Sequence, residues 1–245
     1  MSKRSIIAIQ DEEEWCQYLR EAFEDTVSCP EFVKSAQEAL PAIRKKSFDV
    51  VFANPELLNA PLVAALQMQR NSQQNFRCFS LGTGQGGSST FLFDDRFSGI
   101  PTTLDDFQRV LTKRLTFEKP IRLLVVDDEP EIRQVYRDFF DHRNEPQYIV
   151  ETAGNGKEAE AMIEKNFPDV LVLDIKMPVK DGRELYRDLK RACRLPPTIV
   201  FFDIVSADDV LEIRRFGNPA FVEKGSRSSG MPEMASLIKK IAYFG

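Results

Sequence analysis

Residues 121–128 read IRLLVVDD, and residues 170–182 read VLVLDIKMPVKDG. Each stretch begins as a continuous apolar run and turns acidic where that run ends. Continuous apolar strands, rather than alternating ones, are typical of strands buried on both faces, as in a parallel sheet covered by helices. The two stretches therefore predict parallel strands whose acids gather at the carboxyl edge of one sheet.

The residues around these stretches predict five strand–helix units in the C-terminal half. We expect strands at 121–126, 148–152, 170–173, 198–202 and 220–223, followed in turn by helices that begin near Pro130, Gly156, Gly182, Ala207 and Met231. A proline such as Pro130 suits the first turn of a helix, where its missing N–H costs no hydrogen bond. This alternation predicts a doubly wound, flavodoxin-like α/β sandwich.

The same order of elements occurs twice along the chain. The segments SIIAIQDEEEW and IRLLVVDDEPEI overlay with an offset of 117 residues, and SFDVVFANPEL and FPDVLVLDIKM overlay with an offset of 120. A pattern that recurs in this way indicates a tandem duplication. We therefore expect two doubly wound, five-stranded parallel-sheet domains in tandem, at 1–117 and 118–245, joined by a short linker.

The composition is that of an ordinary folded, soluble protein. Hydrophobic residues make up 42% of the chain and charged residues 29%, a balance that allows a substantial core. The net charge is -5 and neither half is basic, which disfavours direct nucleic-acid binding because phosphate neutralisation needs a Lys/Arg-rich face. The apolar runs are too short to cross a bilayer and no signal-peptide layout is present, so we expect a cytoplasmic protein without membrane insertion.

Four charged residues are expected at the carboxyl ends of strands in the C-terminal half. Asp127 and Asp128 end the first strand, Asp174 ends the third and Lys224 ends the fifth. Carboxylates held close together repel one another, and a hard divalent cation between them removes that cost. Oxygen ligands without imidazole or thiolate favour Mg²⁺, which also bridges to phosphate oxygens. This pattern makes Asp174 the natural nucleophile and Lys224 the cation that balances charge beside an incoming phosphoryl group.

The stretches VVDDEPEIR, VLVLDIKMPVKDGREL and FVEKG resemble the three strand ends that mark receiver domains of two-component response regulators, such as the chemotaxis receiver. The resemblance runs from residue 121 to about 244. It implies that Asp174 is phosphorylated by a histidine kinase or phosphotransfer protein, and that Lys224 contacts the phosphoryl group. It also implies that Mg²⁺ is held by Asp127, Asp128, Asp174 and the backbone carbonyl of Lys176. Each residue alone has an ordinary interpretation as a turn residue or helix cap, but this combination in this order favours the receiver.

Two positions depart from the receiver pattern. Receivers carry Ser or Thr at the end of the fourth strand, where the hydroxyl binds the phosphoryl group, whereas this sequence has Phe202 or, with a one-residue gap, Asp203. Neither side chain replaces that hydroxyl. The switch aromatic is matched by Phe221, but Gly225 replaces the proline that usually follows the lysine. We expect Asp174 to accept phosphate while the response at the switch positions, Phe202 and Phe221, is weakened or rerouted.

The N-terminal half lacks the residues that this chemistry needs. The overlay of the two halves places Gln10 and Asp11 at the acid pair, Asn54 at the acceptor and Ile100 at the lysine. Asparagine has no nucleophilic carboxylate, so we interpret this half as a degenerate pseudo-receiver that serves as a binding or dimerising module or as a lid. The sequence GTGQGG at 82–87 fits a dinucleotide fingerprint, but no helical pattern follows it, and we expect a loop in place of the fourth helix.

Three functions remain open at this level. The leading hypothesis is a response regulator without an output domain, phosphorylated on Asp174 and acting on a downstream protein target, with dimerisation as an option. The alternative is an adaptor or scaffold in which neither half is phosphorylated. An aspartate-based phosphatase is disfavoured because Lys176 stands where such an enzyme needs its second acid. Apart from Mg²⁺-dependent self-phosphorylation from a phosphodonor, we therefore expect no enzymatic activity.

Overall fold

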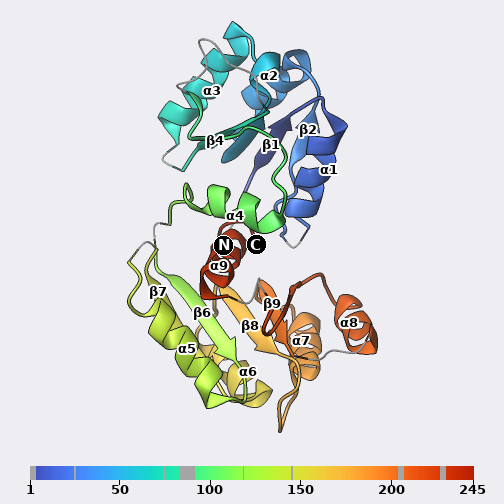
Figure 1. The fold of residues 1–245 in the computed structure, drawn as a ribbon, viewed down its shortest axis with the longest axis vertical. Helices are drawn as coiled ribbons and strands as arrows, with labels where there is room; N and C mark the ends of the chain where they lie inside the picture. Colours follow the sequence, from blue (N-terminus) through green and yellow to red (C-terminus); the bar gives the residue numbers. More distant parts are fainter. Residues whose placement is uncertain are drawn as a thin grey trace. The chain divides into compact units, whose positions relative to one another are not determined.

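The computed structural model describes residues 4–24, 26–73, 75–82, 92–117, 119–144, 146–203, 207–226 and 230–245 (Figure 1). The chain divides into two compact units. The C-terminal unit comprises Phe117–Tyr243, and the N-terminal unit comprises Ser2–Thr116 together with Phe244–Gly245. The loop that the sequence predicts around GTGQGG lies, apart from Gly82, outside the described residues.

The C-terminal unit is built on a five-stranded sheet whose neighbouring strands are all parallel. The strand order is β10-β9-β8-β6-β7, which is the doubly wound 2-1-3-4-5 arrangement read from its far edge. The strands are β6 Ile121–Val126, β7 Tyr148–Ala153, β8 Val170–Asp174, β9 Thr198–Phe202 and β10 Ala220–Glu223. The helices are α5 Pro130–Phe140, α6 Gly156–Lys165, α7 Gly182–Arg191, α8 Ala207–Arg214 and α9 Met231–Phe244.

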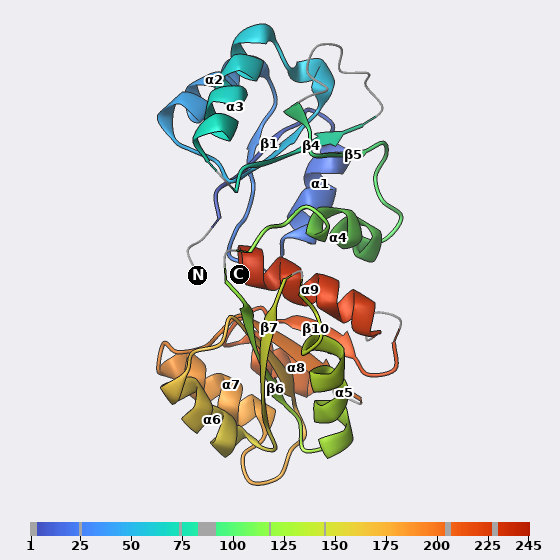
Figure 2. The same ribbon diagram turned by 90° about the vertical axis from the view of Figure 1, so that its left-hand side faces the viewer.

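Alternate residues of these strands pack against two different helical layers. Leu123 and Val125 of β6 belong to the core that α5 and α9 cover, whereas Leu124 and Val126 belong to the core that α6, α7 and α8 cover. Figure 2 shows α5 on one side of the sheet and α6 and α7 on the other. All residues of β8 are buried, as expected for a strand without an alternating polar face.

The N-terminal unit repeats this architecture with a second parallel sheet in the order β2-β1-β3-β4-β5. The strands are β1 Ile6–Ile9, β2 Glu31–Val33, β3 Val50–Ala53, β4 Arg77–Leu81 and β5 Asp95–Phe97. The helices are α1 Glu13–Ala22, α2 Ala36–Lys45, α3 Ala60–Ser72 and α4 Leu104–Thr112, with a short 3-10 turn, η1 Pro55–Leu57.

The two faces of the N-terminal sheet have different cores. Helices α2 and α3 cover a mainly aliphatic core that includes Ile7 and Ile9 of β1 and Val51 of β3. On the other face, Phe52 stacks on Phe79 with ring centroids 5.4 Å apart, and Phe97 stacks on Phe107 of α4 at 4.9 Å. Stacked aromatic pairs of this kind stabilise a core beyond their buried area.

The predicted fold class is confirmed: the protein contains two five-stranded, all-parallel sheets with flanking helices. In each unit the first and third strands are neighbours, so the chain leaves two adjacent strand ends in opposite directions. Ligands of doubly wound sheets bind in the crevice that this reversal opens. Within the described ranges, each helix is too short or too polar to span a membrane.

Candidate functional site

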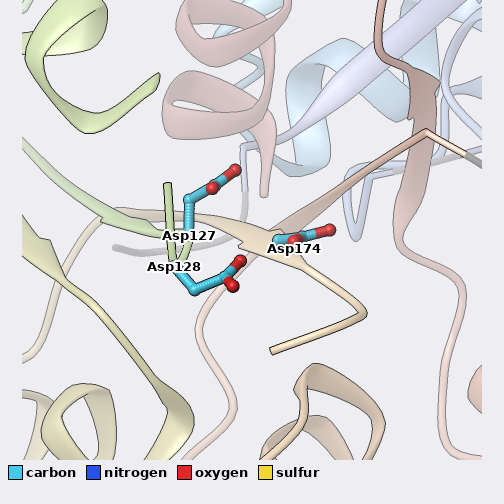
Figure 3. A group of neighbouring side chains, drawn as sticks. All are labelled: Asp127, Asp128 and Asp174. Carbon is cyan, nitrogen blue, oxygen red and sulfur yellow. The ribbon is translucent and has the colours of Figure 1, made fainter. Parts of the chain in front are cut away.

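Three aspartates lie at the carboxyl edge of the sheet in the C-terminal unit (Figure 3). Asp127 and Asp128 directly follow β6, and Asp174 is the last residue of β8. These are the two adjacent strand ends at which the chain reverses its direction of winding. One carboxylate oxygen from each aspartate lies within 4.8 Å of the other two. The structure thus brings together the three acids that the sequence singled out.

Lys224 directly follows β10 and carries an ammonium group to these acids. Its Nζ lies 3.0 Å from Oδ2 of Asp127, 3.5 Å from Oε1 of Glu129 and 3.6 Å from Oδ2 of Asp174. The Lys224 side chain is only 9% exposed. Burial by itself lowers the pKa of Lys224, but the close pairing with Asp127 and the charge of Asp174 outweigh it, so the pKa lies above its ordinary value. Lys224 is therefore a fixed cation at the site.

Asp127 keeps one carboxylate oxygen without a hydrogen bond. Its Oδ1 accepts from the backbone N–H of Glu129 at 2.9 Å. Its Oδ2 is buried and lies 3.0 Å from the Lys224 ammonium, with which it forms an ion pair, and has no other partner among the described residues. Burial raises the pKa of Asp127, although the Glu129 N–H and Lys224 both act to lower it. A buried carboxylate oxygen with free lone pairs is suited to coordinate a cation.

Asp174 is 6% exposed, and its environment disfavours the ionised form. Burial raises the pKa of Asp174 to about 6, and the charge of Asp127 adds to this, while Lys224 acts to lower it. Oδ1 of Asp174 accepts from the backbone N–H of Ile175 at 2.8 Å. A cation between the carboxylates would favour the ionised form, which is the form that a nucleophile requires.

The site opens into a hollow of about 390 Å³. Its lining residues include Asp128, Asp174, Lys224, Glu129, Lys176, Phe202 and Asp203. Carboxylates outnumber ammonium groups in this lining, which favours a cationic ligand or a cation that accompanies an anion. Glu129 is a site residue that sequence reasoning missed, and its place directly after the acid pair could have pointed to it. Lys176 is exposed at the rim, and its backbone carbonyl is the expected ligand there.

The loop between β8 and α7 fixes the backbone of the acceptor. The Gly182 N–H donates to the carbonyl oxygen of Ile175 at 2.9 Å. A Cβ atom at Gly182 would lie 2.0 Å from the carbonyl oxygen of Asp174, so only glycine fits. Met177 is 8% exposed and anchors the loop in the core beneath α6 and α7. The Asp-x-x-Met-Pro-x-x-x-Gly spacing therefore has a packing reason at both its methionine and its glycine.

The expected switch positions hold two aromatic rings in contact. The centroids of Phe202 and Phe221 are 6.4 Å apart with an interplanar angle of 69°. The guanidinium of Arg214, from α8, lies over the Phe221 ring at 5.4 Å. Both rings pack against the core that α6, α7 and α8 cover. None of the described residues that line the hollow carries a hydroxyl group.

The N-terminal unit has amides where the C-terminal unit has acids. The pairing of β1 with β3 places Gln10 and Asn54 one residue beyond the paired strands, where the pairing of β6 with β8 places Asp127 and Asp174. Nδ2 of Asn54 donates to Oδ1 of Asp11 at 3.3 Å. The overlay of the two halves therefore gives the same correspondence as the strand registers.

The place of Lys224 differs by one residue from the sequence overlay. Continuing the β4–β5 pairing puts Gly99, rather than Ile100, at the position that Lys224 occupies after β10. The overlay counted back from the last helix, but the connection from β5 to α4 is one residue shorter than the connection from β10 to α9. Neither residue supplies an ammonium group.

Residues 123–236 match the family model of the response regulator receiver domain. A protein-glutamate methylesterase/protein-glutamine glutaminase of Methanococcoides burtonii is 31% identical over 119 residues, covering 48% of this chain and 32% of that protein. The transcriptional regulatory protein TrcR of Mycobacterium tuberculosis is 37% identical over 93 residues, covering 38% of this chain and 34% of that protein. The response regulator domain of Thermotoga maritima CheB superposes with a TM-score of 0.44 at 26% identity, covering 51% of this chain and 97% of that one.

These relatives correct one expectation. Several of them are named protein-glutamate methylesterase/protein-glutamine glutaminase, which is an enzyme. From the receiver pattern of the sequence we expect no enzymatic activity. That expectation is wrong, because receiver sequences of this kind also belong to enzymes. The chain spans about a third of the length of the curated relatives it matches.

Proposed function

We propose that the C-terminal unit is a phosphoacceptor receiver in which Asp174 takes a phosphoryl group with the help of Mg²⁺. The observation that carries this proposal is the group of three aspartate oxygens within 4.8 Å of one another, beside the Lys224 ammonium. The match of residues 123–236 to the receiver family and the similarity to response regulator MprA of Mycobacterium support the same assignment.

The donor atoms fit Mg²⁺. Asp127, Asp128 and Asp174 offer hard carboxylate oxygens, and Oδ2 of Asp127 is buried without a hydrogen bond. The backbone carbonyl of Lys176 is the further ligand that we propose. When bound, Mg²⁺ supplies positive charge that neutralises phosphate oxygens. The acids of this site then no longer repel the incoming phosphoryl group.

The proposed step is a phosphoryl transfer onto the carboxylate. An oxygen of Asp174 forms a bond to phosphorus while the bond between phosphorus and the donor breaks, and its electron pair leaves with the donor. Lys224 is placed to pair with a phosphoryl oxygen, because its ammonium already lies 3.6 Å from Asp174. The donor is a histidine kinase or a phosphotransfer protein, and the phosphorylated unit acts on a downstream protein target.

The first experiment is to incubate the full chain with Mg²⁺ and acetyl phosphate and to measure its intact mass. We expect the mass of one phosphoryl group to be added to the wild type and not to Asp174→Asn. Asp141→Asn is the matched control, because it makes the same change at an exposed position at the end of α5. Labelling of Asp174→Asn, or no labelling of the wild type, would contradict the proposal.

We further propose that the conformational response to phosphorylation is weakened or rerouted. Phe202 contacts Phe221 instead of offering a hydroxyl to the phosphoryl group. Amide NMR spectra with and without a beryllofluoride mimic test this, and we expect small changes along β9 and α8. Phe202→Thr supplies the hydroxyl and should enlarge those changes. A large change in the amide signals of the wild type, centred on β9 and α8, would contradict this part of the proposal.

The second candidate function is an adaptor in which neither unit is phosphorylated. Two observations favour it: the ring of Phe202 in the lining of the hollow and the left-handed backbone of Gly225, φ 77°, which a proline ring cannot adopt. The acetyl phosphate experiment separates the two functions. An unlabelled wild type that also shows no Mg²⁺-dependent spectral change would establish the adaptor.

We interpret the N-terminal unit, residues 1–117, as a degenerate receiver in tandem with the phosphoacceptor receiver at 118–245. Gln10 and Asn54 at the strand ends, together with the lack of an ammonium group at Gly99, support this interpretation. It predicts that Asn54→Asp alone does not make the N-terminal unit accept phosphate. Mass analysis of Asn54→Asp in the Asp174→Asn background measures this directly.

A further inference from the structure

The N-terminal unit has a groove between α2 and α3 that is apart from its strand-end site. Figure 1 shows these helices side by side over the same sheet. The groove has a volume of about 700 Å³, within the range of ligand sites. Its lining includes Arg44, Lys45 and Lys46 at the end of α2, and Pro61 and Met68 on α3. Met68 is 74% exposed, and Pro61 and Ala64 of the same lining are exposed as well, so apolar side chains gather along one side of α3.

The C-terminal unit provides an internal reference for this groove, because α6 and α7 correspond to α2 and α3 with one constant offset. Most residues 120 apart have the same burial on both helices, whereas Pro61 and Met68 are exposed and their counterparts Asp181 and Asp188 are partly buried. Buried positions that match in this way are Ala39 with Ala159, Ile43 with Ile163, Leu66 with Tyr186, and Gln69 with Leu189. The exposed positions of the two helix pairs can therefore be compared one by one.

In the C-terminal unit, acids on this surface are neutralised within the unit itself. Nζ of Lys180 lies 2.8 Å from Glu160 of α6 and 2.9 Å from Asp188 of α7, so it joins the two helices. Arg194 pairs with Glu164 of α6 at 3.6 Å. These acids are thus paired with cations of the same unit.

In the N-terminal unit, each of these acids is replaced. The residues 120 positions before Glu160, Glu164 and Asp188 are Leu40, Arg44 and Met68. No acid lies among the described residues that line the groove, and α3 contains no Asp or Glu. The surface has changed from acidic and paired to apolar and basic.

The basic residues at the end of α2 have no acid close by, with one exception. Lys46 pairs with Glu31. Arg44 and Lys45 are exposed and take part in none of the ion pairs of the described part of the chain. Cations in the last turn of a helix favour the helix dipole, which is a sufficient reason for their presence. That reason does not account for the exposed Met68 or for the loss of acids on α3.

We infer that the groove between α2 and α3 binds an acidic, amphipathic segment of a partner protein. An apolar side chain of the segment would cover Met68 and Pro61, and carboxylates beside it would pair with Arg44 and Lys45. Methionine suits such a contact because its flexible thioether adapts to different partner side chains. Helices with an apolar stripe commonly bind in grooves between two helices. This inference concerns the N-terminal unit and holds whether or not Asp174 is phosphorylated.

The experiment uses the full chain and two short synthetic helical peptides with the same leucine stripe. One peptide has Glu and the other has Lys at its remaining positions. We expect the Glu peptide to shift the amide NMR signals of residues 43–48 and 60–72, and the Lys peptide to leave them unchanged. Binding of the Glu peptide should weaken as salt is added, because exposed ion pairs are screened.

Three substitutions test which residues carry the binding. Arg44→Glu and Met68→Asp should each weaken binding of the Glu peptide by about tenfold, since one replaces attraction with repulsion and the other removes the apolar contact. Lys165→Glu is the control, because it makes a similar charge reversal in the last turn of α6, at the position that corresponds to Lys45, and it should leave binding unchanged. The amide spectrum of each variant checks that it is folded.

Three outcomes of the peptide experiment would overturn the inference. They are the absence of any shift with the Glu peptide, equal shifts with both peptides, and shifts that survive both Arg44→Glu and Met68→Asp. A second copy of this chain could also occupy the groove. Self-association that sedimentation detects in the wild type, and that Arg44→Glu abolishes, would assign the groove to a second copy and overturn the proposed partner.

Discussion

The strand-end sites of the two units offer the same backbone with different side chains. In the C-terminal unit, Oδ1 of Asp127 accepts from the Glu129 N–H at 2.9 Å. In the N-terminal unit, Oε1 of Gln10 accepts from the Glu12 N–H at 3.1 Å. An amide therefore satisfies the first turn of the following helix about as well as a carboxylate does. The fold itself does not require acids at these strand ends.

The acids of the C-terminal unit carry the free-energy cost of a buried charge, which the amides do not, although Nε2 of Gln10 is itself buried without a hydrogen-bond partner among the described residues. Burial raises the pKa of both Asp127 and Asp174, so each carboxylate is less stable ionised than it would be in water. Asn54 instead donates a hydrogen bond to Asp11. A cost that the fold can avoid in one copy and keeps in the other is typical of a functional site.

A second difference concerns the helix that follows the acceptor strand. Gly182 leaves no room for a Cβ beside Asp174, whereas the residue 120 positions earlier is Leu62, which is fully buried in its own core. The C-terminal unit holds the start of this helix against the acceptor backbone, and the N-terminal unit fills the corresponding position with a leucine. The close approach of the helix to the acceptor backbone is thus found in the unit with the acidic site and is not required by the fold.

The largest predicted effect is that of Gly182→Ala. The added Cβ would lie 2.0 Å from the carbonyl oxygen of Asp174, so the helix must move, and we expect the C-terminal unit to lose about 3 kcal/mol of stability or more. Circular dichroism during urea unfolding reports on both units, whereas fluorescence of Trp15, the single tryptophan, reports on the N-terminal unit. The fluorescence transition should stay in place.

Gly99→Ala is the matched control for this substitution. A Cβ at Gly99 meets nothing within 4 Å, and we expect a change within about 0.5 kcal/mol. Equal effects of the two substitutions would show that the approach of α7 to Asp174 is not tight. The close approach of α7 would then no longer count as a difference between the two units.

The next effect is a pH dependence of the C-terminal unit in metal-free solution. The folded pKa of Asp174 is about 6, above the value of about 3.9 in an unfolded chain, so the folded state holds the proton more tightly. Stability is therefore highest at low pH within this window and falls as pH rises from about 4 to 6, by about 2–3 kcal/mol. The raised pKa of Asp127 acts in the same direction.

Asp174→Asn should remove most of this pH dependence, and saturating Mg²⁺ should reverse the loss at neutral pH. A ligand present at 100 times its dissociation constant stabilises by about 2.7 kcal/mol. Fluorescence of Trp15 should show neither effect, because amides replace the acids in the N-terminal unit. Urea midpoints at several pH values, with and without Mg²⁺, measure both. A flat profile for the wild type would contradict the electrostatic account of the site.

Acids introduced at the strand ends of the N-terminal unit should reproduce the free-energy cost of buried carboxylates but should not make the unit accept a phosphoryl group. In Gln10→Asp/Asn54→Asp, two buried carboxylates join Asp11, and we expect a loss of about 2 kcal/mol that Mg²⁺ partly restores. No phosphoryl group should be gained, since Gly99 supplies no ammonium. Trp15 fluorescence follows the stability and intact mass follows the labelling. Phosphorylation of this variant at residue 54 would show that the lysine is dispensable.

The fold and the meeting of the acids could be predicted from sequence because both depend on local patterns. Continuous apolar runs that end in acids fix which strands are buried and where Asp127, Asp128 and Asp174 lie. Contacts between residues that are distant in sequence could not be predicted in the same way. The pairing of Lys224 with Glu129, and the ring contact of Phe202 with Phe221, depend on side-chain conformations that the strand pattern does not determine.

Two further features required the structure or the relatives. The groove between α2 and α3 could not be predicted from the sequence, because the sequence does not show which residues of these helices are exposed. The offset of 120 residues, which allows the two helix pairs to be compared, is present in the sequence. The expectation of no enzymatic activity failed because a receiver sequence contains no information about the chemistry of the rest of a protein.

The smallest predicted effect is a stabilisation by Val179→Asn. Val179 lies in the loop between β8 and α7 with φ 72°, a left-handed conformation that strains a β-branched residue. Its side chain is 79% exposed, so little packing is lost, and we expect a gain of about 1 kcal/mol. Val27→Asn is the control, since Val27 is also exposed but does not have a positive φ. If both variants change the urea midpoint equally, the loop at Val179 is not strained, and only Gly182 distinguishes the acceptor loop from its N-terminal counterpart.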